Sequence, residues 1–152
     1  MENETTTTIE CDNCQTINRV PISRLKDSPK CGNCGAKIPL GGGPINVTDR
    51  NFDQTIATSP VPVIVDFWAP WCGPCRMLGP MLETLASEMS HDVLIAKLNV
   101  DENPATASRF SVSSIPLVLA FVDGQAVDKQ VGALPVSAMR SWIKKVLQTN
   151  SI

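Results

Sequence analysis

The sequence predicts an α/β protein in which a mixed central sheet is flanked by helices and preceded by a small separate module. After residue 44 the chain alternates between apolar runs of strand length and segments with helical spacing, which is the pattern of an α/β fold. Before this point lies a Gly-Gly-Gly-Pro break, which is typical of a linker because glycine frees the backbone and proline stops regular structure. We therefore expect a module at residues 1–40, a linker at 41–44 and a domain at 45–152.

Five strands are expected in the domain, in the order β-α-β-α-β-α-β-β-α. A short strand is expected at residues 45–47. Near-continuous apolar runs at 61–68 and 93–100 are typical of strands buried on both faces of a sheet. Two further apolar runs, at 117–122 and 126–127, flank an Asp-Gly pair, and this pattern predicts a hairpin.

Helices account for the segments between these strands. Apolar residues at helical spacing predict one helix from residue 72 to about 89 and another over 136–147. Shorter helices are expected through residues 52–56 and over 104–110, and Asp49 is a candidate N-cap for the first of them. Strands separated by helices pair in parallel, whereas a hairpin adds an antiparallel edge, so the sheet is expected to be mixed.

Composition limits the class of protein. The 152 residues are 43% hydrophobic, enough for a packed core, and the net charge of -2 provides no basic field for nucleic acid or acidic lipid. The first eight residues are polar and acidic, unlike an export signal, and no apolar run approaches the ~18 residues of a membrane span. We expect a cytoplasmic, monomeric protein that binds neither nucleic acid nor membrane.

Four cysteines give the N-terminal module its chemistry. The first forty residues contain no Phe, Trp or Tyr, so they cannot bury enough surface to fold without a staple. Two C-x-x-C pairs separated by sixteen residues match the spacing of structural zinc sites; these are Cys11, Cys14, Cys31 and Cys34. Four thiolates would close a tetrahedral shell around one structural Zn²⁺. The alternatives are two further redox pairs or a set of disulfides. In either case we expect the domain core to exclude these residues.

A third C-x-x-C pair lies in the domain, where a buried strand ends and a helix begins. A helix N-terminus stabilises a thiolate through free backbone N–H groups and the macrodipole, so Cys72 should be the activated sulfur. Cys75 follows one turn later, within reach, and Pro74 is tolerated because the first turn offers its missing N–H no acceptor. The alternatives are two core cysteines or half of a zinc site.

The segment Asp-Phe-Trp-Ala-Pro-Trp-Cys-Gly-Pro-Cys-Arg at residues 66–76 resembles the active-site segment of the thioredoxin family. Lys-Leu-Asn-Val-Asp at 97–101, Ser-Ile-Pro at 114–116 and the Asp-Gly turn fall where that family has its other landmarks. The resemblance covers residues 45–149 and implies the thioredoxin fold. The cysteine pairs ahead of the domain, a zinc-ribbon-like module, are similar to those of the zinc-containing bacterial thioredoxin 2 type. Two departures are Arg76, where many members have Lys, and Leu117, where many have Thr.

The resemblance implies a role for individual residues. It implies that Cys72 is the attacking nucleophile, Cys75 the resolving thiol and Asp66 a buried acid/base behind them. Pro116 corresponds to the cis-proline that faces the dithiol in this family. The implied substrate-binding residues are Trp71, Gly73, Pro74, Ile115, Pro116, Gly132 and Ala133.

The implied activity is that of a protein-disulfide reductase acting by thiol–disulfide exchange on protein disulfide substrates, through a redox-active disulfide. An NADPH-dependent thioredoxin reductase would regenerate it, so the flavin and nicotinamide belong to that partner and none is expected here. A disulfide isomerase or oxidase is an alternative, although Gly-Pro between the cysteines resembles the reducing members. A zinc-ribbon interaction module with secondary redox activity is the other alternative, and the ribbon lacks the aromatics that stack on nucleic acid.

Overall fold

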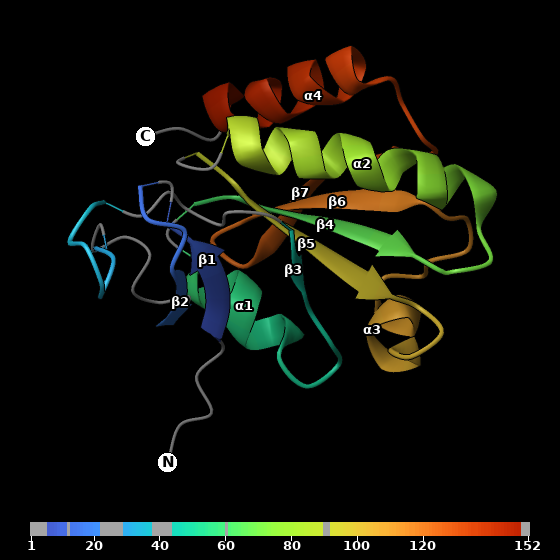
Figure 1. The fold of residues 1–152 in the computed structure, drawn as a ribbon. Coiled ribbons are helices and arrows are strands. Elements are labelled where there is room, and N and C mark those ends of the chain that lie inside the picture. The colour runs from blue at the N-terminus through green and yellow to red at the C-terminus, as the bar shows by residue number, and fades with distance from the viewer. Residues whose placement is uncertain are drawn as a thin grey trace.

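The computed structural model describes residues 6–11, 13–21, 29–37, 44–59, 61–89 and 92–149. These residues form a two-stranded hairpin and a five-stranded sheet with two helices on each face (Figure 1). The strands are β1 (Thr6–Glu10), β2 (Ile17–Pro21), β3 (Ile45–Asn46), β4 (Val63–Trp68), β5 (Leu94–Asn99), β6 (Leu117–Val122) and β7 (Gln125–Val131). The helices are α1 (Phe52–Thr58), α2 (Gly73–Glu88), α3 (Pro104–Arg109) and α4 (Val136–Thr149). The predicted order of elements in the domain is confirmed.

The central sheet is mixed, with the strand order β3-β5-β4-β6-β7. β3 and β4 pair in parallel with β5, while β6 pairs antiparallel with both β4 and β7. β4 therefore has neighbours on both sides, and its first five residues are buried. Such a strand must be apolar on both faces, which is the reason for its continuous apolar run.

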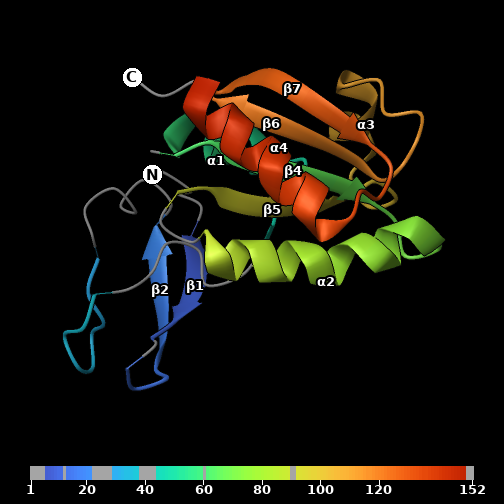
Figure 2. The same cartoon turned by 90° about the horizontal axis from the view of Figure 1, so that it is seen from above.

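Each face of the sheet has its own hydrophobic core. Alternate residues of β4 point to opposite faces, so Val65 and Phe67 face α1 and α3 whereas Ile64 faces α2 and α4 (Figures 1 and 2). Aromatic rings fill the α1/α3 side, where the ring centroids of Phe52 and Phe121 lie 5.5 Å apart. The other side is aliphatic, built largely from α2 and α4.

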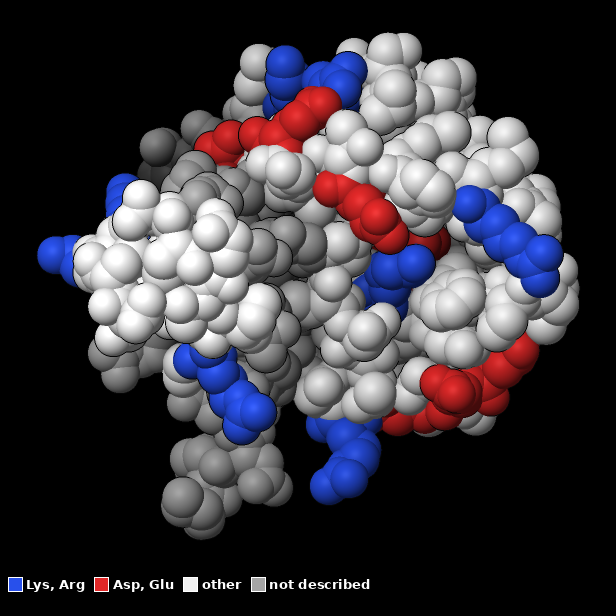
Figure 3. All heavy atoms as spheres, in the orientation of Figure 1, with Lys and Arg blue, Asp and Glu red and all other residues white. Residues whose placement is uncertain are grey.

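The surface carries no concentration of one charge on the face drawn in Figure 3, where Lys and Arg are interspersed with Asp and Glu. None of the helices in the described part of the chain has the length and hydropathy of a membrane span.

The N-terminal module contains an antiparallel hairpin, β1–β2, that was not among the predicted elements. Its signal in the sequence is the run of β-branched residues at 5–9, which favours a strand. The module lies beside the β3 edge of the sheet, toward the C-terminal end of α2 (Figures 1 and 2).

The expectation that the domain core excludes the module is wrong. Cys11, Val20 and Cys31 are at most 5% exposed and belong to the same buried cluster as Ile45 and Val47. A segment without aromatic side chains cannot close a core of its own, and here it completes its burial against the domain. Of the predicted linker, residues 41–43 lie outside the described residues.

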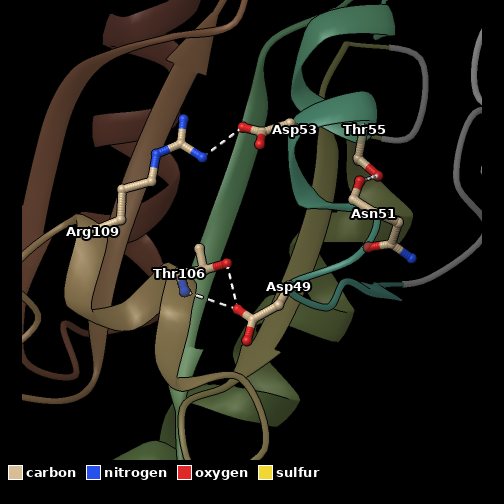
Figure 4. Close-up of polar contacts among 6 residues, drawn as sticks. All are labelled: Asp49, Asn51, Asp53, Thr55, Thr106 and Arg109. Carbon is tan, nitrogen blue, oxygen red and sulfur yellow. Dashed lines mark hydrogen bonds and ion pairs between the residues drawn. The ribbon is translucent and has the colours of Figure 1, made fainter.

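Asp49 caps a different helix from the one predicted. α1 begins after Asn51 without a side-chain cap, whereas the Asp49 carboxylate accepts hydrogen bonds in the first turn of α3. The donors are the N–H of Ala105 and the N–H of Thr106, and Figure 4 shows the second of these bonds. The carboxylate also accepts one from the buried Thr106 hydroxyl, at 2.6 Å, and this bond and those N–H groups lower the pKa of Asp49. The carboxylate thus joins two segments more than fifty residues apart.

This arrangement predicts that Asp49→Ala lowers the melting temperature by roughly 3–6 °C, because three donors of α3 lose their acceptor. The matched control is Asp53→Ala, which removes an exposed ion pair between α1 and Arg109 of α3. Exposed pairs contribute little, so its melting temperature should stay within about 1 °C of the parent. Thermal unfolding by circular dichroism measures both, and equal effects of the two substitutions would contradict the capping role.

Candidate active site and candidate metal centre

The dithiol lies where β4 passes into α2. Cys72 is the N-cap of α2, with an extended backbone, and it forms a disulfide with Cys75. The backbone N–H of Cys75 donates to Cys72 Sγ at 3.2 Å. A sulfur in this position meets the free N–H groups and the positive end of the helix dipole, both of which stabilise a thiolate.

The loop before Cys72 is held from two sides. The Nε and one terminal nitrogen of Arg76 both donate to the carbonyl oxygen of Pro70, at 3.1 and 2.8 Å. The indole N–H of Trp71 donates to a carboxylate oxygen of Asp101 at 3.0 Å. In the sequence Arg76 stands out only as a departure from Lys, and Asp101 only as part of a landmark. The choice of Arg at this position was the signal in the sequence for this contact, because a guanidinium can donate two hydrogen bonds side by side and a Lys ammonium cannot.

Most of the expected substrate-binding residues surround the disulfide. The Ile115–Pro116 peptide bond is cis, and the Ile115 carbonyl oxygen lies 3.8 Å from Cys72 Sγ. Gly132 N–H donates to the Pro116 carbonyl oxygen at 2.8 Å, which brings the loop after β7 to the loop before β6. Trp71 is 67% exposed beside them. Gly73 and Pro74 are exposed in the first turn of α2, whereas Ala133 packs against the α2/α4 core.

Asp66 is buried on the face of the sheet that α2 covers. Its side chain follows Ile64 on that face, and neither carboxylate oxygen has a hydrogen-bond partner among the described residues. Burial raises the pKa of Asp66 from 3.8 to about 7, although the charge of nearby Lys97 lowers it in part. Near neutral pH this carboxyl can both take and give a proton.

Lys97 and Trp68 are half-buried neighbours of Asp66 that the sequence did not assign to the site. Lys97 pairs with Asp66 in the register of β4 and β5, and its Nζ lies 4.7 Å from the centre of the Trp68 ring. Trp68 packs against the cluster of Ala69, Cys72 and Cys75. Lys97 belongs to a predicted strand, and only the pairing of the strands shows that it faces Asp66.

The four remaining cysteines come together in the N-terminal module. Their sulfur atoms all lie within 4.8 Å of one another, and the Cys11–Cys34 and Cys14–Cys31 distances are both 3.6 Å. A tetrahedron of thiolates at ~2.3 Å from zinc has sulfurs about 3.8 Å apart. All four are free thiols, so the alternative of disulfides within the module finds no support here.

Polar groups around these sulfurs suit thiolates that bind a cation. The amide of Asn33 and the hydroxyl of Thr16 lower the pKa of Cys14 to about 6. Although the N–H of Cys14 favours the Cys11 thiolate, burial and the neighbouring sulfurs raise the pKa of Cys11 to about 11. Four thiolates in one cluster repel one another, which disfavours their ionisation. A divalent cation bound between them offsets this repulsion. The residues therefore fit a structural zinc ion.

A disulfide across the first turn of a helix, with an exposed tryptophan and a cis-proline loop beside it and a buried carboxyl on the face beneath that helix, defines a thiol–disulfide oxidoreductase. Comparison with known proteins agrees. A family model described as "Thioredoxin" matches residues 43–145, and one described as "Thioredoxin 2, N-terminal", a zinc ribbon, matches residues 10–36. The chain belongs to the thioredoxin family and carries an N-terminal zinc ribbon.

Named relatives match the domain. Thioredoxin 1 of Synechococcus elongatus is 48% identical over 101 residues, which are 66% of this chain and 94% of the relative. Thioredoxin 2 of Chlorobaculum tepidum is 50% identical over 96 residues, 63% of this chain and 88% of the relative. Thioredoxin of Haemophilus influenzae is 45% identical over 101 residues, 66% of this chain and 94% of the relative.

The metal centre predicts one zinc ion per chain, measurable by elemental analysis, and its loss in Cys31→Ser. Because Cys31 also belongs to the buried cluster with Ile45 and Val47, the melting temperature of the whole chain should fall with the metal. Cys75→Ser is the matched control and should keep its zinc, since it lies outside the cluster of four. Full retention of zinc by Cys31→Ser would contradict the assignment of all four cysteines as zinc ligands.

Proposed function

We propose that this protein reduces protein disulfides through Cys72 and Cys75. The observation that carries the proposal is the disulfide at the N-terminus of α2, with Cys72 as its N-cap. The other supporting features are the exposed Trp71 in front of it and the unpartnered Asp66 carboxyl on the face beneath α2.

The reaction begins with the reduced dithiol. The Cys72 thiolate attacks one sulfur of the substrate disulfide, so a bond forms between Cys72 and that sulfur while the substrate disulfide breaks. The other substrate sulfur leaves as a thiolate and takes a proton. The Cys75 thiolate then attacks Cys72, forms the Cys72–Cys75 disulfide and releases the second substrate thiol. Two electrons pass to the substrate, and an external dithiol must return them for the next cycle.

Asp66 would act on the second step. Cys75 must lose its proton before it can attack, and a carboxyl whose pKa lies near 7 accepts a proton efficiently at neutral pH. Lys97 would keep part of the Asp66 population ionised, because its positive charge favours the carboxylate. Asp66 is therefore proposed as the proton acceptor, and Lys97 as the residue that sets its ionisation.

The proposed partners are protein substrates with accessible disulfides and an NADPH-dependent thioredoxin reductase that supplies the electrons. We also propose that the module at residues 1–40 binds one structural zinc ion, joined by a linker at 41–44 to the domain at 45–152. The cytoplasm, where thiols are kept reduced, is the compartment that this chemistry suits.

Substitution of the two cysteines tests the function. Cys72→Ser should abolish reduction of insulin, because no nucleophile remains at the helix N-terminus. Cys75→Ser should leave the mixed disulfide unresolved, and it should be visible as a higher band on a non-reducing gel. A mixed disulfide trapped by Cys72→Ser and not by Cys75→Ser would reverse the two roles. A measured reduction potential far more oxidising than ~-200 mV would favour the oxidase instead.

The raised pKa of Asp66 predicts a pH-dependent gain in stability for Asp66→Asn. The folded state holds the proton more tightly than the unfolded state, whose pKa is 3.8, so ionisation destabilises the fold. The resulting loss of folding stability is absent below about pH 4, grows as the pH rises to about 7 and amounts to roughly 2–4 kcal/mol at pH 7. Asp66→Asn should be more resistant to denaturant than the oxidised parent at pH 7, equally resistant at pH 4, and ~10²-fold slower in turnover.

Chemical denaturation at the two pH values and stopped-flow turnover at pH 7 make these measurements. Asp92→Asn is the control, because it removes the same charge at an exposed position. A gain in stability that is the same at pH 4 and pH 7 would show that Asp66 does not titrate in this range. Turnover as fast as the parent would remove its role in the reaction.

A further inference from the structure

A cavity of about 210 Å³ lies between the loop that follows α3 and the edge strand β7. Its floor is apolar, formed by Phe110, Leu117 and Leu119 on the α1/α3 face of the sheet. This volume is below the ~300 Å³ at which pockets for drug-sized ligands begin, so it suits one or two amino-acid side chains.

The rim of the cavity is open and polar. Ser111, Ser113, Ser114 and Lys129 line it and are exposed, and the apolar Val131 also lies at the rim with 55% of its surface exposed. Lys129 is the only charged residue among the residues that line the cavity, and the described residues include no ion pair to its ammonium group. The cavity therefore combines an apolar floor with a single positive charge at its mouth.

Two residues that line the cavity are chain neighbours of residues at the disulfide. Ser114 directly precedes Ile115, whose carbonyl oxygen lies 3.8 Å from Cys72 Sγ. Val131 directly precedes Gly132, whose N–H bonds to the Pro116 carbonyl oxygen. Since consecutive Cα atoms are ~3.8 Å apart, the wall of the cavity begins one residue away from the loops that lie beside the disulfide.

We propose that this cavity is a specificity subsite for the protein substrate. It accepts an apolar side chain that lies within three residues of the attacked cysteine, next to an acidic residue that meets Lys129. The inference rests on the proposed function, because it assigns the occupant to the polypeptide whose disulfide is reduced. An extended chain that lies across the exposed residues around the disulfide sends alternate side chains to opposite sides, so one register places a side chain over the cavity.

Defined peptides test the subsite. Each is a Gly/Ser peptide with one cysteine joined by a disulfide to 2-mercaptoethanol. Each carries one residue pair, Leu-Glu, Leu-Lys or Gly-Glu, within three residues of that cysteine. The register is the distance along the peptide between this pair and the cysteine. The pre-reduced full-length protein is mixed with each peptide, and the rate of release of the peptide thiol is divided by the rate with bis(2-hydroxyethyl) disulfide, which is too short to reach the cavity.

In one register the Leu-Glu peptide should react about threefold faster than Leu-Lys, as expected of an exposed ion pair. It should react about tenfold faster than Gly-Glu, because the leucine side chain is buried. Lys129→Glu should reverse the preference for Glu, whereas Lys145→Glu, the same charge change on exposed α4, should retain it. In 0.5 M NaCl the preference for Glu should disappear while that for Leu remains.

Three results would overturn the subsite. The first is a Glu-to-Lys ratio in Lys129→Glu equal to that of the parent, and the second is equal rates for the Leu and Gly peptides in every register. The third is an equal response of Lys145→Glu, because the effect would then belong to net charge. Failure of the parent to reduce bis(2-hydroxyethyl) disulfide would instead remove the proposed reductase function. The two failures are therefore distinguishable.

Discussion

The burial of β4 is the constraint on which the rest of the structure depends. This strand is paired on both sides and covered by helices on both faces, so its end fixes where the chain emerges and where α2 begins. Cys72 is placed at a helix N-terminus because the chain must turn there to cover the sheet. Asp66 is buried for the same reason, since it belongs to the same strand. One packing requirement thus positions both the nucleophile and the carboxyl behind it.

The buried carboxyl of Asp66 serves the reaction proposed for this site but lowers the stability of the fold. An unpartnered carboxyl in the interior is unfavourable once ionised, and a fold selected for stability alone would place an apolar residue there. The same desolvation raises the pKa of Asp66 to about 7, where proton exchange with a thiol is efficient. The positive charge of Lys97 lowers the pKa of Asp66 in part, but Lys97 does not form a hydrogen bond to its carboxylate. In front of the disulfide a large apolar ring, that of Trp71, is exposed to solvent, and its indole N–H donates a hydrogen bond to Asp101.

The zinc ribbon lies toward the C-terminal end of α2, whereas the dithiol lies at its N-terminal end (Figure 2). α2 has 16 residues and is therefore roughly 24 Å long. The described residues of the ribbon thus lie at the end of α2 opposite to the disulfide. Its physical connection to the domain is through buried side chains, since Cys11 and Cys31 share a cluster with Ile45. The metal centre and the domain core are thus coupled in stability.

The sequence by itself determined the order of the domain's elements, because strand and helix periodicities and the Asp-Gly turn are local signals. It also identified the cysteine pairs, whose spacing is a property of the chain. The tertiary structure decided what depends on distant segments meeting: that Asp49 caps α3, that Lys97 faces Asp66, and that Arg76 holds the Pro70 carbonyl. It also placed Cys31 in the shared core. A local pattern states which groups a residue can bind, but only the packing of the sheet and helices brings a partner within reach.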